Sequence, residues 1–516
     1  MGARASDEGP QTLGRLLESR ASATPDKTFL ISEADGRSYT YAEFDRAVNR
    51  TANLLAGLDV GKGDVVSLLL PNGVEYVAAY FACFKLGALA GPVNSLLKAE
   101  EMAYVVGNSE AKVLLYHPEF EGQVLEVFES LGETLTPLKF ENVEAAGDDL
   151  SDDPSDDDAA FKGTPIEADD EAIIIYTSGT TGKPKGCLLT HANLLANARQ
   201  ITEWMGFTED DRLLTIMPLF HMNAVTVTTA TAMYAGGSTV VSPRFSATRF
   251  WQIVSEHRVT SFGSVATMLS MLLAKYPDGV PEEFQTDSLR FAMCGSAPVP
   301  VEVMRRFEER FRCLVVEGYG LSESTCRSTF NPPDERRRPG SCGLPIGNEV
   351  RVFDEEDREV AAGEAGEIVL RGPNIFKGYY KNEEATRRAF RSGWFHTGDV
   401  GYKDSDGFLF IVDRKSDMII RGGENIYPRE IDELLYSHPA VAEAAAVGVP
   451  DELYGEEVAA YVVLREGANA AEEELIEFCR AHLADYKCPK TLHVVDSLPK
   501  GPTGKVLKRE LTRLRQ

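Results

Sequence analysis

The sequence predicts an α/β protein with a large N-terminal domain of parallel α/β units, a small β-rich subdomain and a small α+β C-terminal domain. Three observations support this fold class. The chain has 516 residues, which is too many for one ordinary hydrophobic core. Short β-branched runs alternate with helical stretches from about residue 64 to residue 318. The pattern then changes twice, after Pro339 and again after Arg414.

The first part is typical of a largely parallel sheet, because helices separate its strands. We expect helices at 193–198 and 301–311, and the second has apolar residues in helical register. Helices of this kind would cover both faces of the sheet. The predicted strands are 65–70, 113–116, 173–176, 213–217, 239–242 and 291–294.

After Pro339, short alternating strands are separated by glycine turns, which indicates a β-rich subdomain. Its strands are expected at 349–353, 367–371 and 408–412. A mixed pattern then begins, so we place the domains at 1–414 and 415–516. The second domain should contain helices 428–437 and 471–483 and strands 444–447 and 459–464.

Composition excludes several classes of function. The net charge of −27, from 53 basic and 80 acidic residues, argues against binding to nucleic acid or anionic membranes. The eight cysteines form no CxxC pair or dense cluster, which favours reduced thiols and a cytoplasmic location. No secretion signal or long apolar run is found, so we expect no integral membrane association. The acidic segment 147–158 is expected to be a solvated loop, and the sequence leaves a monomer or a homodimer open.

The strongest local signal is YTSGTTGKPKG at Tyr176–Gly186, directly after a predicted buried strand. Such a loop can surround phosphates with backbone N–H groups, hydroxyls and ammonium charge. It is not a Walker loop, because Pro184 stands where that motif requires glycine. A flexible surface turn is the alternative.

This loop resembles the phosphate-binding signature of the adenylate-forming superfamily, which includes acyl-CoA synthetases, luciferases and nonribosomal peptide adenylation domains. Six further motifs follow in the order found in that superfamily. They are PLFH at 218–221, GSAP at 295–298, EGYGLSES at 317–324, WFHTGD at 394–399, DRKSDMIIRGGENIYP at 413–428 and PKGPTGKV at 499–506. Seven ordered matches over about two thirds of the chain identify it as a member of the AMP-dependent acyl-CoA synthetase family.

The resemblance implies a fold, a reaction and a set of small molecules. Residues 1–414 would form the AMP-binding and acyl-binding domain, including a β-barrel-like subdomain, and 415–516 a mobile domain that carries the catalytic lysine. A carboxylic acid would attack the α-phosphate of ATP, with Mg²⁺ present, to give an acyl-adenylate and pyrophosphate. Coenzyme A, the co-substrate, would then accept the acyl group and release AMP.

Individual roles follow from position in the motifs. Lys505 resembles the catalytic lysine, which stabilises charge on the carboxylate and the α-phosphate. Glu323 resembles the carboxylate that holds Mg²⁺. The residues expected to bind ATP or AMP are Thr177, Ser178, Gly179, Thr180, Thr181, Gly182, Gly295, Ser296, Ala297, Glu317, Gly318, Tyr319, Ser322, Asp399 and Arg414.

Within that set, Tyr319 would stack on adenine, with the small residues 295–297 on its other face. Asp399 would accept hydrogen bonds from both ribose hydroxyls, with Arg414 beside it. Ser322 stands where the family most often has threonine, and serine keeps the hydroxyl group of that residue. For each residue the alternative is an ordinary core, turn or surface position.

The resemblance also implies that the C-terminal domain rotates between the two half-reactions. Ser416 stands at the usual hinge, where many members have Asp or Lys. Gly422 and Gly423 would line the tunnel for the CoA thiol, although a tight turn explains two glycines equally well.

Four residues should approach the acyl group by position in the family, namely His221, Asn223, Val225 and Val265. Most neighbouring candidates are apolar or small, which favours an uncharged aliphatic, alicyclic or aromatic acid. Val225 stands where some fatty acyl-CoA synthetases have a tryptophan gate, which suggests a wider acyl channel.

Other functions remain open on the sequence. An adenylase that loads a separate carrier protein is the main alternative, followed by a luciferase-like oxygenase. A regulatory adenylate-binding homologue is disfavoured by the presence of both Lys505 and Glu323. GLSES at 320–324 is not the elbow of a serine hydrolase, because Ser324 replaces the final glycine.

Overall fold

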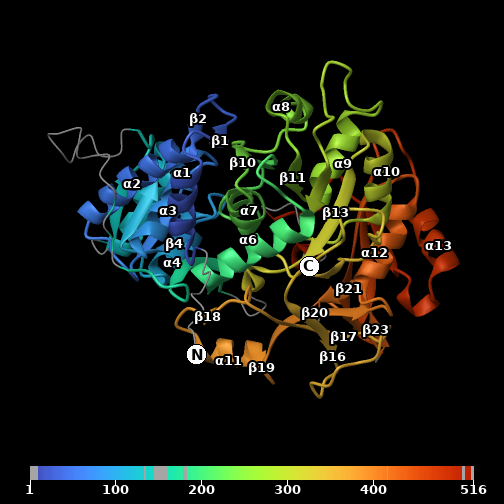
Figure 1. Cartoon of the computed structure of the whole chain (residues 1–516). Helices are drawn as coiled ribbons and strands as arrows, with labels where there is room; N and C mark the ends of the chain where they lie inside the picture. The colour runs from blue at the N-terminus through green and yellow to red at the C-terminus, as the bar shows by residue number, and fades with distance from the viewer. Residues whose placement is uncertain are drawn as a thin grey trace, which may run out of the picture.

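The computed structural model describes residues 10–132, 135–144, 161, 163, 165–177, 183–414, 417–422, 424–501 and 506–512. Their strands form two large sheets, a small antiparallel sheet and a C-terminal sheet. In Figure 1 the N-terminal part of the chain (blue) and the C-terminal elements (orange and red) lie on opposite sides of the molecule. The predicted α/β class, with a large N-terminal and a small C-terminal domain, is confirmed.

The first large sheet has seven strands in the order β18-β8-β7-β4-β3-β5-β6. The five consecutive strands from β7 to β6 are parallel to one another, while β8 and β18 are antiparallel to their neighbours. The strands are β3 (Val65–Leu69), β4 (Leu89–Pro92), β5 (Val113–Tyr116), β6 (Thr136–Lys139), β7 (Glu171–Thr177), β8 (Lys185–Thr190) and β18 (Gly378–Tyr379). Associated helices are α3 (Val74–Leu86), α4 (Ala99–Asn108) and α5 (Glu121–Leu131), and the 3-10 turn η1 spans Pro118–Phe120.

The second large sheet has nine strands in the order β15-β14-β13-β12-β11-β9-β10-β1-β2. The N-terminal strand β1 pairs in parallel with β10, about 200 residues later, and the two lie side by side in Figure 1. The strands are β1 (Thr28–Ser32), β2 (Ser38–Thr40), β9 (Arg212–Thr215), β10 (Ser238–Val241), β11 (Ser261–Ser264), β12 (Phe291–Cys294), β13 (Leu314–Tyr319), β14 (Thr329–Phe330) and β15 (Leu344–Pro345). The helices are α1 (Leu13–Ala23), α2 (Tyr41–Gly57), α6 (His191–Met205), α7 (Thr231–Ala235), α8 (Phe250–His257), α9 (Ala266–Lys275) and α10 (Val301–Phe311).

Local chemistry explains where these elements begin and end. The helix expected at 193–198 is longer, because the Thr190 hydroxyl caps the N–H of Asn193 and Gly206 ends the helix at φ +61°. Helix α10 has the predicted bounds and buries Met304, Phe307 and Phe311 along one face.

The β-rich subdomain contains the path β16-β17-β20-β19, with β21 paired to β20. Among the described residues this is an open antiparallel sheet, to which Cys342 and Gly343 are joined by hydrogen bonds with Leu409. Its elements are β16 (Glu349–Phe353), β17 (Gly366–Arg371), α11 (Glu383–Ala389), β19 (Phe390–Arg391), β20 (Trp394–Lys403) and β21 (Leu409–Arg414).

The C-terminal elements enclose a core of their own, which includes Ile431, Leu435, Val458 and Leu475. Helix α12 also contacts the rest of the chain: the Arg429 guanidinium donates to the Ile411 carbonyl at 2.6 Å. The elements are β22 (Ile419–Arg421), β23 (Glu424–Ile426), α12 (Pro428–Ser437), β24 (Val441–Asp451), β25 (Gly455–Leu464), α13 (Glu472–His482), the 3-10 turn η5 (Asp485–Lys487), β26 (Thr491–Val494) and α14 (Lys508–Leu511).

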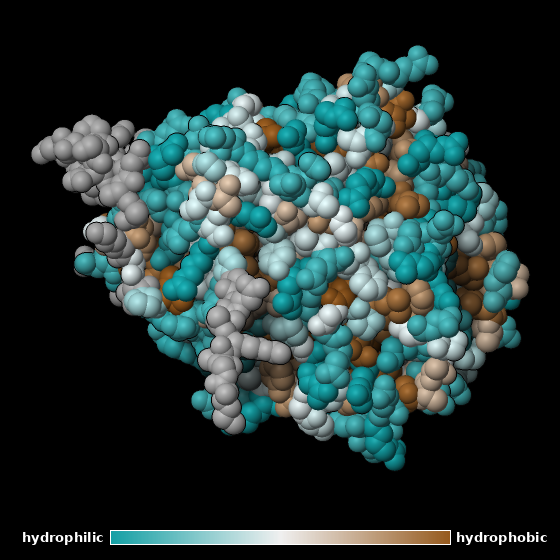
Figure 2. Space-filling view, viewed as in Figure 1, coloured by the Kyte–Doolittle hydropathy of each residue, from teal (hydrophilic) through white to brown (hydrophobic). Residues whose placement is uncertain are grey.

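Hydrophilic residues cover most of the face seen in Figure 2. None of the described helices combines the length and the apolar character that a bilayer crossing requires. The acidic stretch 147–158 lies outside the described residues.

Candidate active site

Three parallel strands carry many of the predicted site residues to one edge of the nine-stranded sheet. In the pairing register Ser264 of β11 lies beside Cys294 of β12, and Cys294 lies beside Glu317 of β13. Val265 and 295–297 directly follow β11 and β12, and 318–319 end β13, so these residues lie at the same carboxyl edge of the sheet. Ligands of open α/β sheets bind at such an edge.

The backbone at this edge leaves no room for larger residues. A Cβ on Gly295 would lie 2.6 Å from Nη2 of Arg327 and 2.7 Å from the carbonyl oxygen of Gly318. The next residue, Ser296, has φ +70°, a conformation that costs energy for any residue other than glycine. Close backbone approach and local strain are both typical of ligand sites.

Tyr319, Asp399 and Arg414 form a connected group. The Tyr319 hydroxyl donates to Oδ2 of Asp399 at 2.6 Å, and Nε of Arg414 lies 3.2 Å from Oδ1 of the same carboxylate. Asp399 of β20 and Arg414 of β21 are direct partners in the sheet, which sets this geometry. Burial lowers the pKa of Arg414, but the charges of Asp399, Asp417 and Glu323 and the nearby Tyr319 raise it overall. The guanidinium therefore stays charged beside the carboxylate.

Glu323 lies where β7 ends and the phosphate-binding motif begins. It belongs to the 3-10 turn η4 (Ser322–Ser324), and its Oε1 accepts hydrogen bonds from the Tyr379 hydroxyl at 3.0 Å and from Thr177 at 3.4 Å. No group of three or more His, Cys, Asp or Glu suited to a metal is found among the described residues. One buried carboxylate fits Mg²⁺, which takes few protein ligands and completes its shell with phosphate oxygens and water.

His221 and Asn223 begin an unusual segment. Asn223–Ala230 (η3) is a π-helix, a rare conformation that is frequent at functional sites. Burial lowers the pKa of His221 to about 4, so the imidazole is neutral near pH 7. Asn223 packs against β11, because a Cβ on Gly263 would lie 2.6 Å from its Oδ1. Nε2 of His221 and both amide atoms of Asn223 are buried without hydrogen-bond partners among the described residues.

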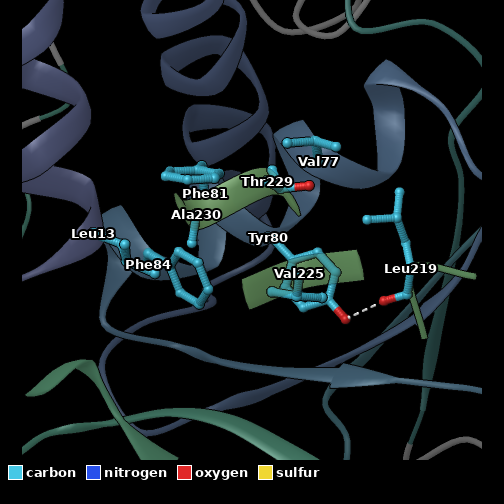
Figure 3. Close-up of a pocket in the computed structure, with 9 residues that line it drawn as sticks. All are labelled: Leu13, Val77, Tyr80, Phe81, Phe84, Leu219, Val225, Thr229 and Ala230. Carbon is cyan, nitrogen blue, oxygen red and sulfur yellow. Dashed lines mark hydrogen bonds between the residues drawn. The ribbon is translucent and has the colours of Figure 1, made fainter. Parts of the chain in front are cut away.

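Val225 faces the N-terminal helices. It lines a small apolar cavity of about 10 Å³ together with Tyr80 and Leu219, and the Tyr80 hydroxyl donates to the Leu219 carbonyl at 2.8 Å (Figure 3). The other lining residues are Leu13, Val77, Phe81, Phe84, Thr229 and Ala230. The volume is about that of one water molecule, so Val225 has a packing role that the sequence did not indicate.

Glu317 lies beneath the edge of the nine-stranded sheet that carries the candidate site residues. Its Oε1 accepts a hydrogen bond from the N–H of Val299 at 3.1 Å, so it anchors the loop that carries Gly295. Burial raises the pKa of Glu317 to about 7, against the opposing charge of Arg429 from helix α12.

Some predicted residues cannot be placed. Ser178, Gly179, Thr180, Thr181, Gly182, Ser416, Gly423 and Lys505 lie outside the described residues. Gly422 has φ +59° between β22 and β23, and its N–H donates to the Tyr454 carbonyl at 2.9 Å. At Gly422 the structure therefore contains a tight turn.

Arg327 is a site residue that the sequence reasoning missed. It follows Glu323 by four positions, is only 1% exposed, and its guanidinium lies against Gly295. The only sequence signal was an arginine close behind the EGYGLSES motif, and an arginine in a loop is usually on the surface.

Comparison with known proteins agrees with this geometry. The sequence model of the AMP-binding enzyme family matches residues 17–380, and that of the AMP-binding enzyme C-terminal domain matches residues 430–505. The chain is 38% identical to the sulfoacetate–CoA ligase of Cupriavidus necator over 513 residues, which cover 99% of both chains. It is 35% identical to the long-chain-fatty-acid–CoA ligase FadD13 of Mycobacterium tuberculosis, over 97% of this chain and 98% of that one.

Among solved structures, ATP-bound MatB from Rhodopseudomonas palustris matches with a TM-score of 0.89 and 32% identity, over 97% of this chain and 98% of MatB. The match over nearly the full length agrees with the two family matches, which lie in the N-terminal and the C-terminal part of the chain. The chain therefore belongs to the AMP-binding enzyme family, within the adenylate-forming acyl-CoA synthetases.

Proposed function

We propose that the group formed by Tyr319, Asp399 and Arg414 binds the nucleoside of ATP, and that the neighbouring Glu323 holds the Mg²⁺ of its phosphates. The enzyme is an ATP-dependent, AMP-forming acid–thiol ligase, with ATP and coenzyme A as co-substrates. The observation that carries the residue assignment is the Asp399 carboxylate, which is held between a buried hydroxyl and a guanidinium. Its orientation is fixed before the nucleotide arrives.

In the first half-reaction, a carboxylate oxygen of the acid attacks the α-phosphorus of ATP, and the bond to the bridging oxygen breaks as pyrophosphate leaves. Negative charge is redistributed among the α-phosphate oxygens during this step. Lys505 is proposed to stabilise that charge, with the motif at 177–182 contacting the phosphates. The Mg²⁺ held by Glu323 would neutralise phosphate charge. Tyr319 and residues 295–297 would enclose the adenine.

In the second half-reaction, the thiol of CoA loses its proton, sulfur attacks the acyl carbonyl, and AMP leaves with the acyl–phosphate oxygen. We propose that residues 415–516 rotate as a unit about Ser416, which removes Lys505 and brings Gly422 and Gly423 towards the thiol path. The separate hydrophobic core of the C-terminal elements supports rigid-body rotation. Gly422 is exposed in this turn, which is compatible with the proposed role.

The second candidate function is loading of a separate carrier protein through its pantetheine thiol. One assay separates the two: thioester formation with free CoA, with a holo-carrier protein and with no thiol. We expect thioester with free CoA at a rate close to that of adenylation. Product only with the carrier protein would overturn the assignment of CoA as the acceptor.

We also propose a cytoplasmic location, which is supported by the eight cysteines, all buried and unpaired. The homodimer stays a prediction, and sedimentation velocity would test it.

A further inference from the structure

A buried arginine with unused hydrogen-bond donors lies at the edge of the candidate site. The guanidinium of Arg327 reaches the ends of β12 and β13, where a Cβ on Gly295 would lie 2.6 Å from its Nη2. The side chain is 1% exposed, although arginine is rarely buried without a partner. Glycine at 295 therefore makes room for this guanidinium.

The backbone around Arg327 is held in a strained conformation. Thr325 has φ +65° and ψ −58°, the centre of a tight γ-turn in which the N–H of Cys326 donates to the Ser324 carbonyl at 2.8 Å. A β-branched residue with positive φ is an outlier, and such strain persists only where the surroundings impose it.

Two buried amides fix the position of Arg327 itself. Asn197 of α6 accepts from the N–H of Arg327 at 3.1 Å and donates to its carbonyl at 2.7 Å. Asn374 donates to the same carbonyl at 3.0 Å. The side chain is thus presented from a rigid support, as precise ligand recognition requires.

The charge of Arg327 is not balanced by its described neighbours. Its Nη1 donates to the Cys326 carbonyl at 3.2 Å and contacts the Cys326 sulfur at 3.5 Å, and the guanidinium lies 5.3 Å from the centre of the Phe330 ring. Burial raises the pKa of the Cys326 thiol, so the sulfur is uncharged. Nε and Nη2 have no hydrogen-bond partner within the described part of the chain. A guanidinium stays protonated, and an unpaired buried charge is costly.

Other unsatisfied polar atoms lie at the same end of the sheet. Asn223 packs on Gly263 of β11, the strand next to β12, and both of its amide atoms are unpartnered among the described residues. His221, two residues earlier, is neutral because burial lowers its pKa to about 4. Among the described residues, this end of the sheet therefore offers the Arg327 guanidinium together with the uncharged hydrogen-bonding groups of Asn223 and His221.

We propose that Arg327 binds a second anionic group of the substrate, so that the acid carries a carboxylate or sulfonate in addition to the carboxylate that is activated. This inference rests on the proposed function, because it requires the acid to lie beside the nucleotide that Tyr319 and residues 295–297 would enclose. The planar fork of a guanidinium matches the paired oxygens of such groups. The proposal replaces the uncharged acid expected from sequence, which did not take Arg327 into account.

The test uses pairs of acids that differ in one anionic group. Full-length enzyme is assayed for pyrophosphate release and CoA thioester with diacids of two to five carbons, with monocarboxylates of equal length, and with sulfoacetate and 3-sulfopropionate. We expect at least one dianionic acid to exceed its monocarboxylate partner about 100-fold in kcat/KM. The class of acid with the higher kcat/KM, dicarboxylate or sulfonate, identifies the second anionic group of the substrate.

Variants then assign the preference to Arg327. Arg327→Gln should lose about 100-fold on the dianionic acid and little on the monocarboxylate, whereas Arg327→Lys should recover part of the loss. Arg336→Gln, at a side chain that is 78% exposed, is the matched control and should behave as the wild type. If Arg327→Gln does not fold, the preference of the wild type for dianionic acids and the effect of Arg327→Lys still test the proposal.

Two results would overturn the proposal: a wild-type enzyme that prefers monocarboxylates, or folded Arg327 variants that lose both acids of a pair equally. Failure of the proposed function is distinguishable, because the wild type would then release no pyrophosphate with any acid.

Discussion

Asp399→Asn tests the assignment of the nucleoside site. The substitution keeps the shape of the side chain and leaves an oxygen that can accept from the Tyr319 hydroxyl, which lies 2.6 Å from Oδ2. It removes the negative charge that faces Arg414 at 3.2 Å and that should strengthen hydrogen bonds from the ribose hydroxyls. A hydrogen bond to a charged acceptor exceeds one to a neutral acceptor by about 1 kcal/mol. Two such bonds give about 2 kcal/mol, or roughly a 30-fold weaker binding of ATP.

Calorimetric titration with ATP and with 2′-deoxy-ATP measures this effect directly. The wild type should bind 2′-deoxy-ATP more weakly than ATP, and Asp399→Asn should lose most of that discrimination. Asp406→Asn is the matched control, since this exposed carboxylate pairs with Arg338 on the neighbouring turn. A variant that still discriminates against 2′-deoxy-ATP by the wild-type factor would refute the assignment of Asp399 to the ribose.

Three further predictions concern catalysis, stability and packing. Lys505→Ala should slow adenylation by two to three orders of magnitude, which corresponds to about 3 to 4 kcal/mol of transition-state stabilisation. Thioester formation from presynthesised acyl-adenylate should stay nearly normal. Loss of both half-reactions in a folded variant would show that Lys505 does not act specifically in the first half-reaction. The pKa of Glu317 is raised by burial from 4.5 to about 7, so its contribution to stability is complete below pH 4.5 and is lost as the pH rises through about 7. Glu317→Gln, which keeps an acceptor for Val299, should flatten the dependence of the urea midpoint on pH between those values, and an unchanged slope would show that another group titrates there. Val225→Trp should lower the free energy of unfolding by about 1 to 3 kcal/mol, because the adjacent cavity of about 10 Å³ cannot hold an indole; an unchanged melting temperature would show that Val225 can turn away from this cavity.

The sequence alone predicted those features that depend on local chemistry. Helices α10 and α12 and strand β12 have the expected bounds, because periodic apolar residues and nearby turn residues define them within a short stretch. The candidate nucleotide residues were found through ordered motifs, and the structure brings Tyr319, Asp399 and Arg414 together as these motifs imply. Lys505, Ser416 and Gly423 stay predictions, since they lie outside the described residues.

Only the tertiary structure decided how distant segments pair and which way side chains face. The pairing of β1 with β10 joins residues about 200 positions apart, and no local pattern specifies such a contact. Val225 belongs to a motif segment, but the packing of α1 and α3 against η3 directs it into an apolar cavity. From the sequence, Arg327 is indistinguishable from an ordinary surface arginine. It is buried because Asn197 and Asn374, which are 130 and 47 residues away in the chain, hold its backbone carbonyl. The free energy of placing a charge depends on everything that surrounds it, and those surroundings exist only in the folded protein.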